Sequence, residues 1–214
     1  MKGLYVIVDP EHCAGRDPER IAEAALRGGC AALQLRAKQL SDRARLALAR
    51  ALASRSRAAG VPFWMNDRLD LALLCGADGA HLGQDDVALA DARTLFPRAL
   101  GLSTHDLAQA RAAAHAGADL IGFGPVFPTA SKRNPDPVVG LDRLRDVCAA
   151  VQVPVVAIGG ITHAHAAEVA RAGATYAAVI GAVCGAVDPE AAARTLHGAL
   201  LGARPGAQSG AHSG

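Results

Sequence analysis

Eight short apolar runs, separated by segments with helical character, are the feature that most constrains the fold of this chain. Most runs are continuous rather than alternating, which is typical of parallel strands whose outer face is covered by helices. The runs are LYVIVD, AALQLR, VPFWMN, GAHLG, ALGLS, LIGFGPV, VPVVAIGG and YAAVIGAV, starting at Leu4, Ala31, Val61, Gly79, Ala99, Leu120, Val153 and Tyr176. We therefore predict a strand followed by a helix, repeated eight times.

The segments between the runs are rich in Ala, Leu and Arg with helical spacing, for example residues 18–27, 41–59, 105–116 and 163–172. Several are followed by glycine, a residue that favours the end of a helix. Eight such units in 214 residues predict an α/β fold of the closed (βα)8 TIM-barrel type. An open doubly wound sheet would give a similar pattern, but no G-x-G-x-x-G motif opens the first predicted helix.

The length favours one barrel domain, residues 1–201, because 214 residues leave little room for another. Residues 202–214 read GARPGAQSGAHSG and show no hydrophobic periodicity. Such a composition predicts a disordered tail.

Composition and charge argue against several classes of protein. Aromatic residues make up 3% of the chain and the formal net charge is +2, so we expect no nucleic-acid partner. The five cysteines are scattered without a C-x-x-C pair, which suits a reducing cytoplasm. No apolar run approaches membrane-spanning length, so we expect a soluble, cytoplasmic protein without a membrane partner. A homo-oligomer is compatible with these features.

Three polar residues alternate along the second run. Gln34, Arg36 and Lys38 are spaced by two, so in a strand they point to the same side, toward the mouth of the barrel. Active sites of such barrels lie at the carboxyl ends of the strands, and two cations there predict an anion site. Alternatively, Arg36 and Lys38 pair with carboxylates at the rim such as Asp67.

Carboxylates follow the third and fourth runs. Asn66 and Asp67 end the third run, and the sequence GQDD after the fourth contains Asp85 and Asp86. Mg²⁺ takes one or two protein carboxylates together with phosphate oxygens and water, and Asp67 and Asp86 could supply them. Manganese could replace magnesium in such an oxygen site. Asp85 has a second interpretation as an acidic residue at the start of the next helix.

The remaining runs end in hydroxyl groups, a lysine and glycines. Hydroxyls and lysine suit phosphate oxygens, and glycine allows backbone amides to approach a ligand. These residues are Ser103, Thr104 and His105 after the fifth run, Thr129, Ser131 and Lys132 after the sixth, Gly159 and Gly160 after the seventh, and Ile180 and Gly181 in the eighth. They predict a second phosphate position near the last two strands. Alternatively, Ser103 and Thr104 cap a helix, and the glycines serve tight packing.

Taken together, these motifs resemble those of thiamine-phosphate synthases, barrel enzymes that join the pyrimidine and thiazole halves of thiamine phosphate. The likeness covers about residues 4–183. It rests on the order of QLRAK, NDRLDLA, GADGAHLGQDD, GLSTH, GFGPVFPTASK and AIGGI. The resemblance implies a transferase that condenses hydroxymethylpyrimidine diphosphate with thiazole phosphate, or its carboxylate form, and releases diphosphate.

The resemblance also implies a role for each matching residue. Arg36, Lys38 and Lys132 would be the catalytic cations. The pyrimidine diphosphate would be held by Gln34, Arg36, Lys38, Asn66, Ser103 and Lys132, Mg²⁺ by Asp67 and Asp86, and the thiazole phosphate by Thr129, Ser131, Gly160, Ile180 and Gly181. Ser131 stands where a second threonine is common, and Gly181 where a serine usually follows the isoleucine. The change at Gly181 removes a hydroxyl donor.

Two other functions stay open on the sequence alone. A thiazole tautomerase is a sister barrel that moves a proton on the thiazole phosphate carboxylate, and His105 would be its acid/base group. The second is a barrel that binds a phosphorylated ligand as a sensor and catalyses no reaction. The set of Arg36, Lys38, Asp67, Asp86 and Lys132 favours the synthase over the tautomerase, which needs no diphosphate site.

Overall fold

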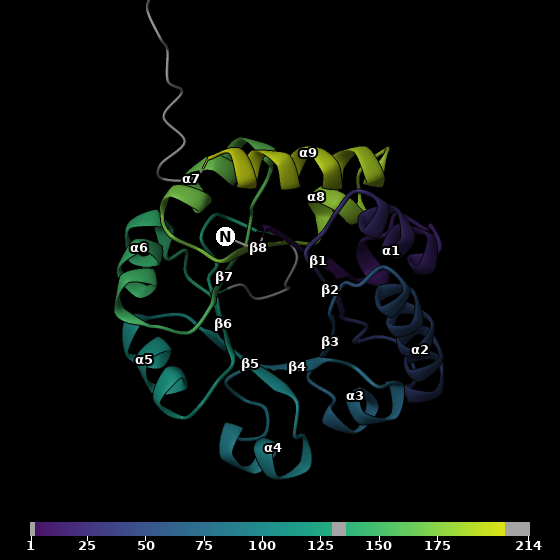
Figure 1. The fold of residues 1–214 in the computed structure, drawn as a ribbon, viewed down its shortest axis with the longest axis horizontal. Coiled ribbons are helices and arrows are strands. Elements are labelled where there is room, and N and C mark those ends of the chain that lie inside the picture. The colour runs from purple at the N-terminus through teal and green to yellow at the C-terminus, as the bar shows by residue number, and fades with distance from the viewer. Residues whose placement is uncertain (1–2, 130–135, 204–214) are drawn as a thin grey trace, which may run out of the picture.

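A computed structural model describes residues 3–129 and 136–203 of the chain. Its eight parallel strands form a closed barrel in chain order, with β8 pairing back to β1 (Figure 1). The strands are β1 (Gly3–Val8), β2 (Ala32–Leu35), β3 (Phe63–Asn66), β4 (Gly79–Leu82), β5 (Ala99–Thr104), β6 (Leu120–Phe123), β7 (Val155–Ile158) and β8 (Tyr176–Val179). The predicted barrel is confirmed, and the open sheet is wrong because no edge remains between β1 and β8.

Helices surround the barrel, as Figure 1 shows. They are α1 (Pro18–Arg27), α2 (Asp42–Ala58), α3 (Leu69–Cys75), α4 (Leu89–Leu95), α5 (Leu107–His115), α6 (Gly140–Ala150), α7 (Ala166–Arg171), α8 (Gly181–Cys184) and α9 (Pro189–Gly202), with 3-10 turns η1 (Pro10–His12) and η2 (His163–His165). None of the helices in the described ranges is long and apolar enough to cross a membrane.

The predicted helix ends agree with local chemistry. Asp17 caps α1 by accepting the Glu19 N–H at 2.9 Å, and Pro18 suits the first helical position. Gly60, Gly117 and Gly173 follow helices with φ angles of 68°, 83° and 99°, the left-handed conformation that glycine adopts without strain.

The boundary of the predicted tail differs by a residue or two from the structure. Gly202, predicted as the first residue of the tail, is the last residue of α9. The rest of that prediction concerns mainly residues 204–214, which lie outside the described ranges.

The core has two layers because side chains on each strand alternate between its faces. Outward-facing residues such as Leu33 and Leu35 pack against the helices. Inward-facing residues form a second cluster inside the barrel, including Tyr5, Trp64 and Tyr176. The ring of Tyr5 lies 6.4 Å from that of Trp64 and 6.0 Å from that of Tyr176, between centroids. Since side chains fill the interior, a ligand has to bind at the mouth.

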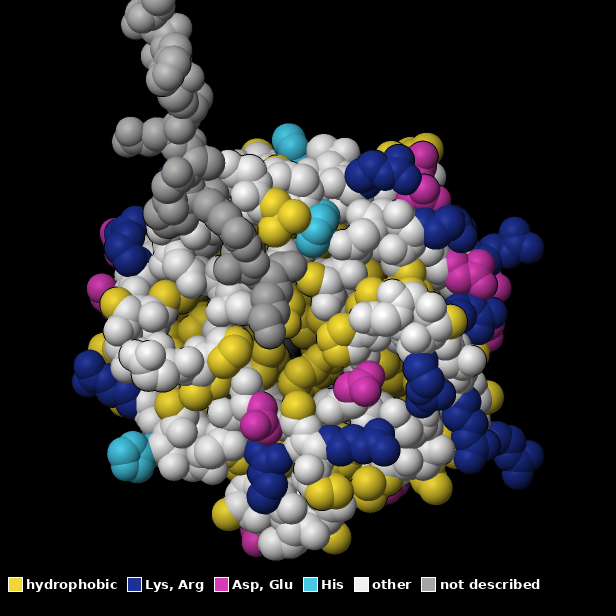
Figure 2. Space-filling model, viewed as in Figure 1, with side chains coloured by type: hydrophobic (Ala, Val, Ile, Leu, Met, Phe, Trp, Pro, Cys, Tyr) yellow, Lys and Arg dark blue, Asp and Glu magenta, His cyan; other side chains and the backbone are white. Residues whose placement is uncertain are grey.

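Large inward-facing side chains sit over glycines of neighbouring strands. A Cβ at Gly79 would lie 2.4 Å from the ring of Trp64, and one at Gly101 would lie 2.5 Å from the ring of His81. These pairs let a narrow barrel hold bulky rings in its interior. Figure 2 shows one face, where apolar side chains gather around the centre and charged ones lie mainly toward the rim.

Candidate active site

The end of β2 carries three of the predicted site residues. Gln34 is buried inside the barrel, and its Nε2 donates a hydrogen bond to Tyr5 Oη at 2.9 Å. Arg36 follows the strand, and its Nη1 donates to Oδ2 of Asp9, a buried residue at the end of β1. The sequence motifs did not single out Asp9, although it ends the first apolar run and so has the strand-end position that selected Asp67.

Lys38 and Asp67 form an ion pair, with Nζ 3.0 Å from Oδ2. Asn66 ends β3, and Asp67 turns away from it with a φ of 62°, a left-handed conformation that aspartate tolerates better than most residues. The Asp67 N–H donates to the carbonyl of His81 at 2.9 Å, which holds this turn against β4. The alternative that Arg36 and Lys38 pair with carboxylates is therefore realised, although the partner of Arg36 is Asp9.

The carboxylates of Asp67 and Asp86 are close enough to influence each other electrostatically. Burial raises the pKa of Asp67, and the neighbouring Asp86 raises it further, whereas Lys38 lowers it. Asp86 Oδ2 also accepts the N–H of Gly83 at 2.6 Å. Two like charges that repel each other create a site that a cation stabilises, so the structure brings the two selected carboxylates within electrostatic range.

Asp85 does not lie in the first turn of a helix, as one interpretation of the sequence expected. The next helix, α4, begins at Leu89 with Ala88 as its N-cap, and its acidic first-turn residue is Asp91. The chain makes a turn through Asp85 and Asp86 instead, because the Asp86 carboxylate bonds backward to Gly83.

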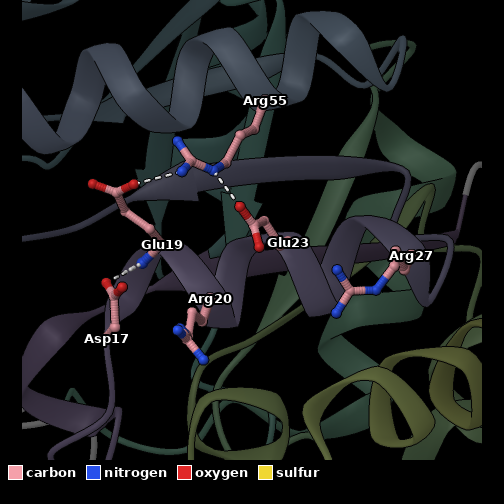
Figure 3. Close-up of a pocket in the computed structure, with 6 residues that line it drawn as sticks. All are labelled: Asp17, Glu19, Arg20, Glu23, Arg27 and Arg55. Atoms are coloured by element: carbon pink, nitrogen blue, oxygen red, sulfur yellow. Dashed lines mark hydrogen bonds and ion pairs between the residues drawn. The ribbon is translucent and has the colours of Figure 1, made fainter.

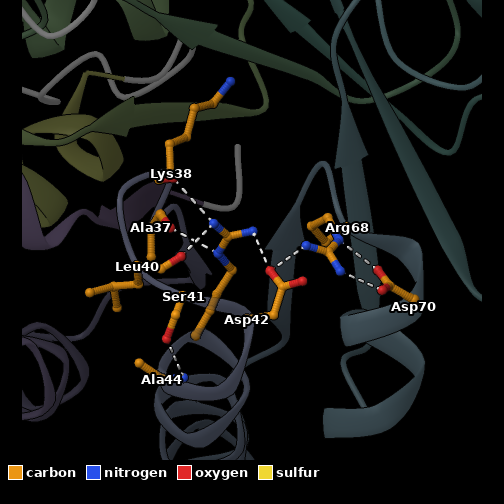
Figure 4. Close-up of polar contacts among 9 residues, drawn as sticks. Ala37, Lys38, Leu40, Ser41, Asp42, Ala44, Arg68 and Asp70 are labelled. Atoms are coloured by element: carbon orange, nitrogen blue, oxygen red, sulfur yellow. Dashed lines mark hydrogen bonds and ion pairs between the residues drawn. The ribbon is translucent and has the colours of Figure 1, made fainter.

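Two arginines fix the loops that present Lys38 and Asp67 (Figure 4). Arg68 donates to Asp42 at 2.5 Å and to Asp70 at 2.6 Å, which joins the β3–α3 turn to the start of α2. Arg45 donates to three carbonyls of the β2–α2 loop, those of Ala37, Lys38 and Leu40. The sequence pattern did not single out these residues, because helix-surface arginines rarely differ in sequence from solvated ones.

Ser103 lies inside the barrel mouth beside His81. The distance between His81 Nε2 and Ser103 Oγ is 3.0 Å, and Gln84 Nε2 donates to the Ser103 carbonyl at 2.5 Å. Ser103 and Thr104 belong to β5, and the N-cap of α5 is Asp106. The alternative that these two hydroxyls cap a helix is therefore wrong.

His105, the acid/base candidate of the tautomerase alternative, bonds to the backbone. Its Nδ1 lies 2.7 Å from the carbonyl oxygen of Gly124, and its Nε2 lies 3.6 Å from Asp136 Oδ2. The ring thus links the end of β5 to the loop after β6.

The glycine pair after β7 supports the β6–α6 loop. A Cβ at Gly159 would lie 2.5 Å from Pro125, and one at Gly160 would lie 2.3 Å from the carbonyl oxygen of Pro128. Next to this contact, the ring of Phe127 stacks on that of His165 at 3.9 Å. Both glycines therefore pack tightly against this loop, and their contact with a phosphate stays a prediction.

The other residues assigned to the thiazole phosphate lie at the ends of β6 and β8. Thr129 is partly buried in the loop after β6, and Ser131 and Lys132 lie outside the described residues. Ile180 is the N-cap of α8, and Gly181 begins that short helix. A Cβ at Gly181 would meet no atom within 4 Å, so this position opens onto free space.

A polar pocket on the outer layer, between α1 and α2, is a separate feature (Figure 3). It is lined by Asp17, Glu19, Arg20, Glu23, Arg27 and Arg55. Arg55 pairs with Glu19 at 2.6 Å and with Glu23 at 2.7 Å, and it lowers the pKa of Glu23. Arg27 pairs with Glu190 outside the pocket, and the pocket contains none of the predicted site residues.

The residues at the mouth belong to a chain that matches a known family over most of its length. The family model described as thiamine monophosphate synthase matches residues 4–183. The chain belongs to this family. As a member of the thiamine monophosphate synthase family it is an enzyme, a transferase.

Curated relatives and solved structures agree with this family. A thiamine-phosphate synthase of Roseiflexus castenholzii is 48% identical over 90% of this chain and 86% of its own, and one of Methanocella arvoryzae is 46% identical over 90% and 92%. The structure of thiamine phosphate pyrophosphorylase from Pyrococcus furiosus superposes with a TM-score of 0.87 at 36% identity, covering 94% of this chain and 96% of that one.

Proposed function

We propose that this chain is a thiamine-phosphate synthase. It joins hydroxymethylpyrimidine diphosphate to thiazole phosphate and releases diphosphate and thiamine phosphate. With the carboxylate form of the thiazole, CO₂ leaves as well. The observation that carries this proposal is the cluster of Arg36, Lys38, Asp67 and Asp86 at the mouth of a barrel of the thiamine monophosphate synthase family. The relatives support the synthase rather than the tautomerase or a sensor without catalysis.

Asp67 and Asp86 would hold Mg²⁺. Across residues 3–129 and 136–203, no group of three or more His, Cys, Asp or Glu residues could hold a metal ion by itself. Two neighbouring carboxylates suit Mg²⁺, which usually completes its ligands with phosphate oxygens and water. When bound, Mg²⁺ would supply positive charge to the diphosphate oxygens.

The chemistry requires charge stabilisation more than a nucleophile. The bond between the pyrimidine CH₂ carbon and oxygen breaks, diphosphate leaves with the electron pair, and the thiazole nitrogen attacks the carbon. The amino group of the pyrimidine donates electrons to the developing cation, so no protein nucleophile is needed. Arg36 and Lys38 would stabilise negative charge on the departing diphosphate.

Lys38 is free to change partners. Its side chain is 52% exposed, so it can leave Asp67 when a diphosphate group offers more oxygens. By the family resemblance, Lys132 would add a third cation, and Gln34, Asn66 and Ser103 would also contact this substrate. Thr129, Ser131, Gly160, Ile180 and Gly181 would hold the thiazole phosphate.

The test is product formation by purified protein given both substrates, with and without Mg²⁺. We expect diphosphate and thiamine phosphate in equal amounts, and only with the metal. Proton exchange in the thiazole carboxylate without diphosphate release would favour the tautomerase. Ligand binding without turnover would contradict the proposal and favour a sensor.

Replacing Gly181 by serine is expected to strengthen binding of thiazole phosphate. The new side chain has room, and its hydroxyl would add one hydrogen bond of about 1 kcal/mol, equivalent to about a fivefold lower KM. Gly198→Ser in α9 is a matched control, since a Cβ there also meets no atom within 4 Å. An unchanged KM for thiazole phosphate in Gly181→Ser would contradict the assigned role of this position.

We also propose that the protein works in the cytoplasm. All five cysteines are free, and four of them are buried, an arrangement that suits a reducing compartment. A homo-oligomer is compatible with the proposal, and light scattering on the purified protein measures the oligomeric state.

A further inference from the structure

Asp9 is a fully buried carboxylate at the end of β1, and neither the sequence motifs nor the proposed reaction assigns it a role. Its side chain is 0% exposed, and its Oδ2 accepts a hydrogen bond from Nη1 of Arg36, whose side chain is 15% exposed. Val8 and Arg36 also extend the ladder between β1 and β2 through an N–H to carbonyl bond of 3.0 Å. The acid and the guanidinium therefore face each other across neighbouring strands.

Several contacts fix the position of Asp9. Its Oδ1 accepts the N–H of Glu11 at 3.1 Å, which makes Asp9 the N-cap of η1. Its backbone carbonyl accepts the N–H of His12 at 2.9 Å and the thiol of Cys13 at 3.2 Å. Nδ1 of His12 also lies 3.5 Å from Oδ2. The carboxylate therefore cannot move unless the whole turn moves with it.

A fixed carboxylate restricts the guanidinium that bonds to it. Arginine has several rotatable bonds and a planar fork of five N–H donors. Among the described residues, Asp9 is the side chain to which Arg36 donates, so the same guanidinium keeps further donors for a ligand. The proposed function assigns two cations in the described part of the barrel mouth to the leaving diphosphate, and Arg36 is one of them. Holding such a group in place before the substrate arrives lowers the entropy cost of binding it.

We infer that Asp9 is a positioning residue, which orients Arg36 toward the diphosphate of the pyrimidine substrate. This inference rests on the proposed function. Asp9 would not touch the substrate, because its carboxylate is already buried between Arg36 and η1. Its contribution should therefore appear only through Arg36.

The first experiment measures steady-state kinetics of Asp9→Asn, which keeps the shape of the side chain and removes its charge. We expect kcat/KM for the pyrimidine diphosphate to fall about 10- to 100-fold, as when residues that orient a ligand-binding group are replaced. KM for thiazole phosphate should stay within about twofold of its original value, because a local change at Arg36 leaves the other phosphate position intact. If KM rose equally for both substrates, the inference would be overturned, since such a result would indicate a general structural role.

Asp119→Asn is a matched control. Asp119 pairs with Arg93 at 2.6 Å and accepts the N–H of Leu100 at 2.8 Å. These bonds lie where β5 and β6 begin, at the opposite end of the barrel from the proposed site. The same chemical change there should leave both KM values unaltered.

A double-mutant cycle separates positioning from any direct role. In an Arg36→Gln background, Asp9→Asn should change kcat/KM for the pyrimidine diphosphate by less than about twofold, because the group it orients is gone. A full additive loss in that background would overturn the inference. If Asp9→Asn does not fold, Asp9→Glu serves in its place, since it keeps the charge and displaces the guanidinium.

Calorimetric titration with inorganic diphosphate and Mg²⁺ gives a readout that does not depend on turnover. We expect Asp9→Asn to weaken this binding about tenfold or more. If the unsubstituted protein forms no thiamine phosphate, the proposed function is contradicted. If the unsubstituted protein forms thiamine phosphate but Asp9→Asn leaves diphosphate binding and kinetics unchanged, only the role of Asp9 is contradicted.

Discussion

Asp67→Asn is expected to lower kcat/KM about a thousandfold. The carboxylate of Asp67 interacts electrostatically with that of Asp86, and we propose that the two hold the Mg²⁺ that neutralises the leaving diphosphate. Removing a charge that acts on the transition state through a metal costs several kcal/mol, and about 4 kcal/mol corresponds to a factor of about 1000. Initial rates measured over a series of Mg²⁺ concentrations test this expectation, and the variant should need far more metal for half of its maximal rate.

The substitution is chosen so that folding is preserved. Asp67 has a φ of 62°, and asparagine tolerates this left-handed conformation as well as aspartate does. Asp85→Asn is the matched control, because it makes the same change one residue before Asp86, at an exposed carboxylate that we do not assign to the metal. Its rate should stay within about twofold of the original. If Asp67→Asn kept its activity and its Mg²⁺ dependence, the proposed metal site would be wrong.

Gly79→Ala is expected to destabilise the barrel by about 2 to 3 kcal/mol. The added Cβ would lie 2.4 Å from the ring of Trp64, a distance that real Cβ atoms do not show, and Trp64 is itself packed against Tyr5 inside a filled barrel. Overpacking of this kind forces side chains from their rotamers. A free-energy change of this size lowers Tm by about 5 to 10 °C in a domain of about 200 residues. Thermal unfolding followed by circular dichroism measures it.

Two further variants show whether the contact with Trp64 is the cause. Trp64→Phe in the Gly79→Ala background should recover part of the lost stability, because a smaller ring frees space for the new methyl group. Gly198→Ala in α9 meets no atom within 4 Å and should stabilise the protein by about 0.5 to 1 kcal/mol, since alanine favours a helix more than glycine. A loss of stability in Gly79→Ala that Trp64→Phe does not reduce would point to a different cause.

The sequence by itself determined the fold class of this protein. Continuous apolar runs, helical periodicity and glycines after helices are local properties, and they predicted every strand from β1 to β8 and the exact span of α1. Strand alternation and position at strand ends also selected Arg36, Lys38, Asp67 and Asp86, because the carboxyl ends of all strands of such a barrel meet at one mouth. Asp67 and Asp86, separated along the chain by α3 and β4, interact electrostatically as that geometry requires.

Only the tertiary structure decided which partner each polar group has. Whether Arg36 bonds to Asp67 or to Asp9, whether Ser103 caps a helix, and whether Gly160 packs against the backbone of Pro128 depend on side-chain directions and on distances between strands. Each strand and helix reads alike whether or not β8 returns to β1, so closure was predicted from the number of units and the missing G-x-G-x-x-G motif, and the tertiary structure confirmed it. Hydrogen bonds between chain segments depend on how those segments pack, whereas sequence spacing predicts the relative positions of side chains only within one strand or helix.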